Sequence, residues 1–278
     1  MLRHRASPSS RLETALTMAA IVDIIRANSH TAFSLIIEPN AMASFVTNPN
    51  NASCSHVQRS YRQNVPLALK KLDLPNVVTY LDAAHGGIFG WRYWGIDYPN
   101  SASDEMLRTW TAAGTLTQFR GLAVNVGSYN AWDLSPGETF DGENPTCPDD
   151  NKARSEILYL QILRRTLQSA LKRANSTSAM PFHAIMDTSR SGVQGIRSHW
   201  TDWCNVKEAS FGIYPVAFGK DNLDAFVWAT MPGFSDGASE VGSIGYTPDC
   251  ALVDSFKPMP ARGMWSQEYF ESLFRWFR

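Results

Sequence analysis

Ile36-Ile37-Glu38-Pro39-Asn40 closes the apolar run 32–37 and decides the fold of this chain. A short, continuous apolar run of this kind is typical of a parallel strand that is buried on both faces. The run ends in polar residues, at the point where the chain would leave the sheet. Enzymes built on parallel sheets place their catalytic side chains at this end of the strands.

The same alternation of apolar runs and helical patterns continues along the chain. Strands are predicted at 32–37, 77–81, 121–126, 181–186, 211–214 and 225–229, and helices at 11–28, 57–72, 104–113, 154–172 and 265–277. Residues 1–11 are expected to form a loose segment and 133–152 a long loop. Since the composition does not change along the chain, residues 12–278 are predicted to form a single α/β domain with a parallel sheet.

Polar residues recur just after the predicted strands, at Asn40, Asp82, Ser128, Asp187 and Asp236. A (β/α) barrel gathers such side chains at the carboxyl ends of its strands. An open, doubly wound sheet places ligands at the same edge, so these residues alone leave both architectures open. No glycine-rich phosphate loop follows the first strand, which argues against a dinucleotide cofactor.

The composition narrows the class of ligand. The 278 residues carry a formal net charge of −1 without a basic block, which argues against nucleic acid as a partner. No apolar run approaches the ~20 residues that span a bilayer, so no membrane role is expected. The chain has nine tryptophans, which either fill the core or form flat platforms for sugar rings.

The four cysteines form no Cys-x-x-Cys pair, so neither a zinc site nor any other metal or cofactor is expected. An even count fits one or two disulfides in an oxidising compartment. Asn51-Ala52-Ser53 and Asn175-Ser176-Thr177 are glycosylation sequons, which add weak support for secretion. The first residues lack the apolar core of a signal peptide. Either the chain is intracellular or its true beginning is missing.

Four segments carry a more specific pattern. They are Ile36-Ile37-Glu38-Pro39-Asn40 with Val46-Thr47-Asn48, Leu74-Pro75-Asn76-Val77 through Tyr80-Leu81-Asp82-Ala83-Ala84-His85, Ser189-Arg190-Ser191-Gly192 with Asp202-Trp203-Cys204-Asn205, and Phe226-Val227-Trp228 through Asp236-Gly237. In order and spacing, over residues 12–278, they resemble glycoside hydrolase family 6. The resemblance implies a distorted parallel (β/α) barrel that hydrolyses β-1,4-glucosidic bonds of cellulose or related β-glucans with inversion. It also implies an extracellular, monomeric enzyme that binds cellulose or β-1,4-gluco-oligosaccharides.

An inverting mechanism requires two carboxyl groups, one as proton donor and one to assist the attacking water. In the family, the donor is the acid that ends the Ile-Glu-Pro-Asp segment, and here that position is Asn40. Glu38 accompanies the donor in the family without replacing it. Asp236 matches the family's base. Asp82 matches an aspartate that lines the cleft, or it is a strand-end acid that caps a loop amide.

Further positions match the family's sugar contacts. His85, Trp91 and Trp203 match substrate-binding positions. Arg190 matches an arginine that would pair with a cleft carboxylate, or it is a solvated surface arginine. Ser128 stands where the family has an asparagine and Ile88 where it has a platform tryptophan. Thr230, Met231 and Phe234 occupy a stretch where a lysine and a glutamate are expected. Together with Asn40, these departures keep open an alternative, a catalytically impaired, glucan-binding homologue.

The resemblance also predicts how the cysteines pair. Cys204 and Cys250 match a family disulfide. Cys54 matches half of another disulfide, whose partner lies in the family's first strand, so Cys54 is unpaired here or bonded to Cys147. Nothing before residue 12 resembles that strand. The barrel is therefore expected to be incomplete at its N-terminus, and whether it cuts chains internally or from an end stays open.

Overall fold

The computed structural model describes residues 9–93, 95–134, 150–176 and 179–275 of the chain. Its elements, in chain order, are α1 (Ser9–Ala27), β1 (Phe33–Ile37), α2 (Ala41–Val46), α3 (Ala52–Lys71), β2 (Val77–Asp82), α4 (Gly86–Phe89), β3 (Arg92–Tyr93), β4 (Ile96–Asp97), α5 (Tyr98–Ala113), β5 (Phe119–Val124), α6 (Glu156–Arg173), β6 (His183–Asp187), β7 (Val216–Lys220), β8 (Leu223–Val227), a 3₁₀ turn (Pro248–Ala251) and α7 (Gln267–Ser272). The first three residues of α1 belong to the segment that was expected to be loose.

The main sheet has the strand order β1-β2-β5-β6-β8-β7. The first five of these strands are mutually parallel, and β7 runs antiparallel to β8. The parallel strands advance in one direction without the reversal that defines a doubly wound sheet. This confirms the prediction of a distorted α/β barrel. Among the described residues, β1 pairs only with β2 and β7 only with β8, so no strand joins these two edges.

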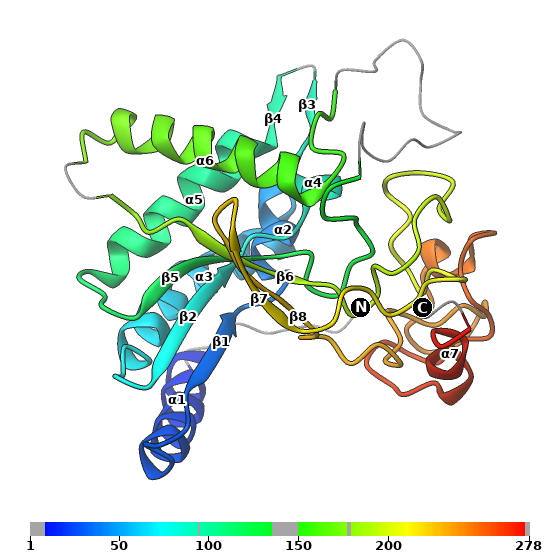
Figure 1. The fold of residues 1–278 in the computed structure, drawn as a ribbon, viewed down its shortest axis with the longest axis horizontal. Coiled ribbons are helices and arrows are strands. Elements are labelled where there is room, and N and C mark those ends of the chain that lie inside the picture. The colour runs from blue at the N-terminus through cyan, green and yellow to red at the C-terminus, as the bar shows by residue number, and fades with distance from the viewer. Residues whose placement is uncertain (1–8, 94, 135–149, 177–178, 276–278) are drawn as a thin grey trace.

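Helices α3, α5 and α6 pack one against the next beside the sheet (Figure 1). Their buried faces and the sheet share one apolar core, in which Leu81, Leu122 and Leu163 are fully buried. Side chains that alternate with these along the strands, such as Tyr80 and Ala123, belong to a second, smaller cluster. Because successive residues of a strand point to opposite faces, that cluster covers the other face of the sheet.

Apart from β7 and β8, the C-terminal third has little regular structure and lies to one side of the helices, with α7 at its edge (Figure 1). It has its own apolar cluster, which includes Val206, Phe211, Tyr269 and Leu273. The predicted closing helix is shorter than expected, since α7 ends at Ser272. No helix in the described ranges is long and apolar enough to cross a membrane.

The strand predicted at 211–214 is wrong, and the strand in this region is β7. The backbone at 212–213 bonds to the residue after β6 and to two side chains instead of to a strand. Gly212 donates its N–H to the carbonyl of Thr188, and the carbonyl of Ile213 accepts the Thr188 hydroxyl at 2.7 Å and the Trp228 indole at 3.0 Å. Apolar composition alone did not separate this loop from a strand.

Candidate active site

The residues after β1, β2, β5, β6 and β8 meet at the carboxyl edge of the sheet, where the sequence predicts the site. Asn125, which follows β5, links three of these strand ends. Its backbone N–H donates to the carbonyl of Ala84, and its side-chain amide donates to the carbonyl of Asp187 at 2.8 Å. Asn125 is fully buried and has a φ of 60°, a left-handed conformation that asparagine tolerates better than most residues. Its contacts therefore fix the relative positions of the loops that carry the candidate residues.

Asn40 and Asp82 are in direct contact. The backbone N–H of Asn40 donates to Oδ2 of Asp82 at 2.9 Å, and the N–H of Ala84 donates to the same oxygen at 3.2 Å. Glu38 and Asn40 have φ values of 54° and 61° on either side of Pro39. The Asp82 carboxyl thus holds the tight turn after β1, as the loop-capping interpretation of Asp82 expects.

Asp82 is only 1% exposed, and its Oδ1 has no hydrogen-bond partner among the described residues. Burial raises the pKa of this carboxyl to about 7, against the opposing effect of the two backbone N–H donors. Asp82 therefore carries a proton at acidic pH. Asn40, in contrast, is exposed, and its side chain makes no hydrogen bond within the described residues.

Asp236 and Arg190 form a two-point ion pair. Nη1 of Arg190 lies 3.0 Å from Oδ2 of Asp236, and Nη2 lies 3.0 Å from Oδ1. Arg190 is 2% exposed and lies over the ring of Tyr129, with its guanidinium carbon 4.5 Å from the ring centroid. Burial alone would lower the pKa of Arg190, but the nearby negative charge of Asp236 outweighs it and raises that pKa.

The two oxygens of Asp236 are used unequally. Oδ2 also accepts the hydroxyl of Tyr129 at 3.1 Å and the backbone N–H of Asn205 at 2.9 Å, whereas Oδ1 accepts only from Arg190 among the residues that the structure describes. The side chain of Asp236 is 18% exposed. Oδ1 therefore keeps a lone pair that can accept a hydrogen bond from a water molecule.

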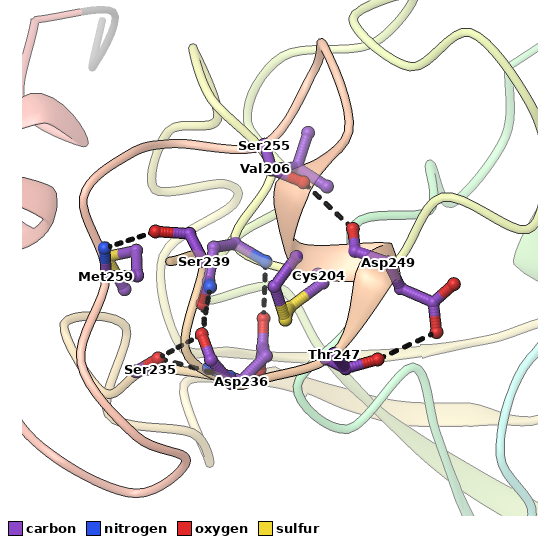
Figure 2. The surroundings of a disulfide bond; sticks show 12 residues. Cys204, Val206, Ser235, Asp236, Ser239, Thr247, Asp249, Ser255 and Met259 are labelled. Atoms are coloured by element: carbon purple, nitrogen blue, oxygen red, sulfur yellow. Dashed lines mark hydrogen bonds between the residues drawn. A yellow bond between two sulfur atoms is a disulfide. The ribbon is translucent and has the colours of Figure 1, made fainter. Parts of the chain in front are cut away.

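The loop of Asp236 is bonded to the loop of Cys204 beside a disulfide (Figure 2). The backbone N–H of Asp236 donates to Oδ1 of Asn205 at 2.7 Å, and the backbone N–H of Asn205 donates in return to the Asp236 carboxylate. The predicted bond between Cys204 and Cys250 is present, with its Cα atoms 4.9 Å apart. Cys54 has no disulfide partner among the described residues, and Cys147 lies outside them.

His85 belongs to a buried polar network that also includes Asn130, Glu156 and Arg197. Nδ1 of His85 lies 3.0 Å from the side-chain nitrogen of Asn130 and accepts the N–H of Gly87 at 3.2 Å. Burial, and then the positive charge of Arg197, lower the pKa of His85 to about 3. The ring is therefore neutral at ordinary pH.

The other residues that the sequence places near the sugar do not belong to one shared network. Trp91 is partly buried and donates its indole N–H to the carbonyl of Gly87 at 2.7 Å. Trp203 is 36% exposed, as a stacking platform requires. Ser128 is buried, and its hydroxyl has no partner within the described residues. Phe234 packs its ring edge-on against Trp265 and presents an apolar surface two residues before Asp236.

Several residues of the site escaped sequence reasoning, namely Asn125, Tyr129, Asn130, Glu156, Arg197 and Asn205. Glu156 stands in the first turn of α6, where an acid is ordinary, and only the contacts with Asn130 and Gly86 show its role. Two signals were available: the polar run 125–130 after β5, whose asparagines suit a tight polar turn, and the place of Asn205 at the end of the segment Asp202-Trp203-Cys204-Asn205. Among the described residues, no group of three or more His, Cys, Asp or Glu side chains could hold a metal ion.

Comparison with known proteins identifies relatives. Residues 15–276 match the family model of glycosyl hydrolases family 6. The 1,4-beta-D-glucan cellobiohydrolase CEL6C of Podospora anserina is 42% identical over 256 residues, which cover 92% of this chain and 61% of that protein. Exoglucanase-6A of Humicola insolens is 35% identical over 257 residues, which cover 92% of this chain and 50% of that protein. The chain thus spans about half to three-fifths of the length of these two relatives.

Solved structures give the same result. The catalytic core of the cellobiohydrolase Cel6A from Chaetomium thermophilum superposes with a TM-score of 0.83 at 32% identity, covering 95% of this chain and 69% of that one. Cellobiohydrolase II from Humicola insolens, in complex with glucose and cellotetraose, superposes with a TM-score of 0.82 at 33% identity, covering 96% of this chain and 69% of that one. On these matches, the chain belongs to glycosyl hydrolase family 6.

Proposed function

We propose that this protein hydrolyses β-1,4-glucosidic bonds of cellulose or related β-glucans by an inverting mechanism, with Asp236 as the base. The observation that carries the proposal is the pairing of Asp236 with buried Arg190, which leaves Oδ1 able to accept a hydrogen bond. An inverting base accepts a proton from the water that attacks the anomeric carbon. A partly exposed carboxylate that is held in place by Arg190 suits that step. The relatives named cellobiohydrolases support the choice of substrate.

This chain is less well equipped to protonate the leaving oxygen. The leaving oxygen requires a proton, and the amide of Asn40 has no titratable proton to give. Asp82 contacts Asn40 and holds a proton below pH 7, but it is sealed from solvent. Proton transfer from Asp82 would need a local opening of the loop after β1. We therefore expect hydrolysis to be slow.

Asn40 also supports a second candidate function, a glucan-binding protein with an impaired hydrolase cleft. In that case Trp203, Trp91 and His85 would still hold glucosyl units while the bond stays intact. Secretion is proposed for both functions, because the relatives are cellulose-type glucanases and the Cys204–Cys250 disulfide suits an oxidising compartment.

Turnover of cellohexaose by the wild type, Asn40→Asp and Asp236→Asn separates the two functions. Position 40 tolerates aspartate, because its side chain is exposed and aspartate accepts the left-handed backbone. We expect Asn40→Asp to raise kcat about 10²- to 10⁴-fold, and Asp236→Asn to abolish turnover. NMR of the fresh product should show the α-anomer, as inversion requires.

Other outcomes decide against one or both functions. If the wild type and Asn40→Asp both bind cellohexaose without cleaving it, the hydrolase proposal fails and the binding function stands. If neither protein gives a tryptophan-fluorescence response to cellohexaose, both functions fail.

A further inference from the structure

The buried network around His85 determines which nitrogen of its ring carries a proton. Asn130 is the centre of this network and is fully buried. Its side chain makes three contacts, at 3.0 Å with Nη2 of Arg197, at 2.7 Å with Oε1 of Glu156 and at 3.0 Å with Nδ1 of His85. Its backbone N–H is held by Oδ1 of Asn125 at 3.1 Å.

Two of these contacts fix the orientation of the Asn130 amide. A guanidinium has donors and no acceptor, so the atom that faces Arg197 must be Oδ1. A carboxylate has acceptors and no donor, so the atom that faces Glu156 must be the side-chain nitrogen. With both ends fixed, the second hydrogen of that nitrogen points at His85.

The amide orientation in turn fixes the state of the imidazole. Nδ1 of His85 meets two donors, the side chain of Asn130 and the backbone N–H of Gly87. It can receive them only with its lone pair, which excludes a proton on Nδ1 and therefore excludes the imidazolium. The neutral ring must then carry its proton on Nε2. No hydrogen bond joins Nε2 to another described residue, and His85 as a whole is 6% exposed.

We propose that Asn130 is a positioning residue that holds His85 as a neutral imidazole protonated on Nε2, so that the ring presents a fixed N–H donor to a glucan hydroxyl. Only the identity of the ligand rests on the proposed function. The charged groups that face the ring come from two elements, Glu156 from α6 and Arg197 from the loop after β6. Both contact Asn130, and the positive charge of Arg197 also acts directly on the pKa of His85. The low pKa of His85 agrees with this arrangement.

The wild-type protein provides the first test. Long-range ¹H–¹⁵N spectra of protein labelled at histidine report the protonation of each ring nitrogen, and loss of a signal in His85→Gln assigns this residue. We expect Nδ1 to be unprotonated and Nε2 protonated throughout pH 4–8. A proton on Nδ1 anywhere between pH 5 and 8 would overturn the proposal, and this measurement does not depend on folding of a variant.

The Asn130→Asp variant provides the second test. It replaces the donor to Nδ1 by an acceptor of the same shape, so Nδ1 should become protonated and Nε2 should lose its fixed role as a donor. Binding of cellotetraose, followed by tryptophan fluorescence, should weaken about 10-fold. Asn151→Asp is the matched control, because Asn151 is equally buried and bonds to Gly86 and Ala153 without contacting His85.

The outcomes separate the positioning role from the proposed function. If Asn130→Asp keeps the wild-type ring state, or if Asn151→Asp changes it equally, the positioning role is refuted. If the ring state is as expected but the wild type binds no cello-oligosaccharide, the positioning role stands and the glucan ligand is wrong. If glucan is hydrolysed while Nδ1 carries the proton, the proposed function stands and the positioning role is wrong.

Discussion

At the scale of single residues, Asp82 and His85 respond to burial in opposite senses. The folded pKa of Asp82 is about 7, above its ordinary 3.8, so Asp82 stabilises the fold fully below pH 3.8 and loses this contribution as the pH rises to 7. The folded pKa of His85 is about 3, below its ordinary 6.5, so its contribution is complete above pH 6.5 and is lost as the pH falls to 3. Between about pH 4 and 6.5 the two dependences oppose each other.

Replacing one of the two residues should expose the dependence of the other. Asp82→Asn keeps an acceptor for Asn40 and removes the titration, so the unfolding free energy should rise with pH between 4 and 6.5 by up to about 1.4 kcal/mol per pH unit. His85→Gln should show the opposite slope. Urea unfolding at several pH values measures both, and Asp133→Asn, at an exposed aspartate, is the control. Equal slopes in Asp82→Asn and the wild type would contradict the prediction.

Replacing only one partner of the Arg190–Asp236 ion pair should lower the free energy of unfolding. Arg190→Met leaves Asp236 without its partner in a largely buried site, and should destabilise the fold by about 3 kcal/mol. The double variant Arg190→Met/Asp236→Asn removes the unpaired charge and should recover part of that loss. Urea unfolding compares the variants. If the double variant is as unstable as Arg190→Met, the loss reflects packing and not charge.

Sequence reasoning predicted the site where a residue follows a strand or matches a motif of the family. Asn40, Asp82 and Asp236 were predicted in this way. In the structure Asp82 is the last residue of β2, and Asn40 and Asp236 lie in the loops after β1 and β8. It did not predict Asn130 or Arg197, because their importance depends on which groups surround them after folding. A buried amide and a surface amide look the same in a sequence.

At the scale of elements, the Cys204–Cys250 disulfide joins two segments of the region with little regular structure. Its cysteines are 46 residues apart, and a crosslink closing a loop of that length restricts the unfolded chain by about 4 kcal/mol. Replacing both cysteines by serine should therefore lower the unfolding temperature by many degrees. Cys54→Ser, at a partly buried cysteine without a disulfide partner among the described residues, should change it little. Thermal unfolding followed by circular dichroism makes the comparison, and equal losses in both variants would refute it.

Elements with a clear period were predicted well, and short ones were not. The helix predicted at 154–172 is α6, shifted by one or two residues, and the strand at 77–81 is β2. Helix α2 has only six residues, too few for a helical period to emerge. Strand β7 was missed because it is mostly exposed, so its side chains follow no apolar pattern.

At the scale of the whole molecule, the parallel sheet followed from strand–helix alternation, but the barrel did not. An open sheet predicts the same local patterns, and the choice between them came from the family resemblance. Strand order depends on which distant segments pair, which no local pattern records. The structure adds a division that the sequence did not indicate, between the core of the sheet and helices and the cluster of Tyr129, Val206, Phe211, Tyr269 and Leu273.

This division predicts that the C-terminal cluster opens without unfolding the sheet. Leu163 is fully buried in the main core, and Leu163→Ala should cost at least about 2 kcal/mol. Amides of β5 that exchange only on global unfolding should then exchange at least about 30-fold faster. The amides of Lys207 and Phe256 bond to carbonyls within the C-terminal region. Their exchange rates should not change, because opening of the C-terminal cluster leaves Leu163 buried.

Leu273→Ala provides the complementary variant, because Leu273 lies in the C-terminal cluster. Its packing is lost both when the C-terminal cluster opens and when the whole molecule unfolds, so the substitution lowers the free energy of both transitions. The amides of β5, Lys207 and Phe256 should therefore all exchange faster. Native-state hydrogen exchange followed by NMR distinguishes the two patterns. If Leu163→Ala speeds the exchange of Lys207 and Phe256 as much as that of β5, the molecule opens as one cooperative unit and the division is only geometric.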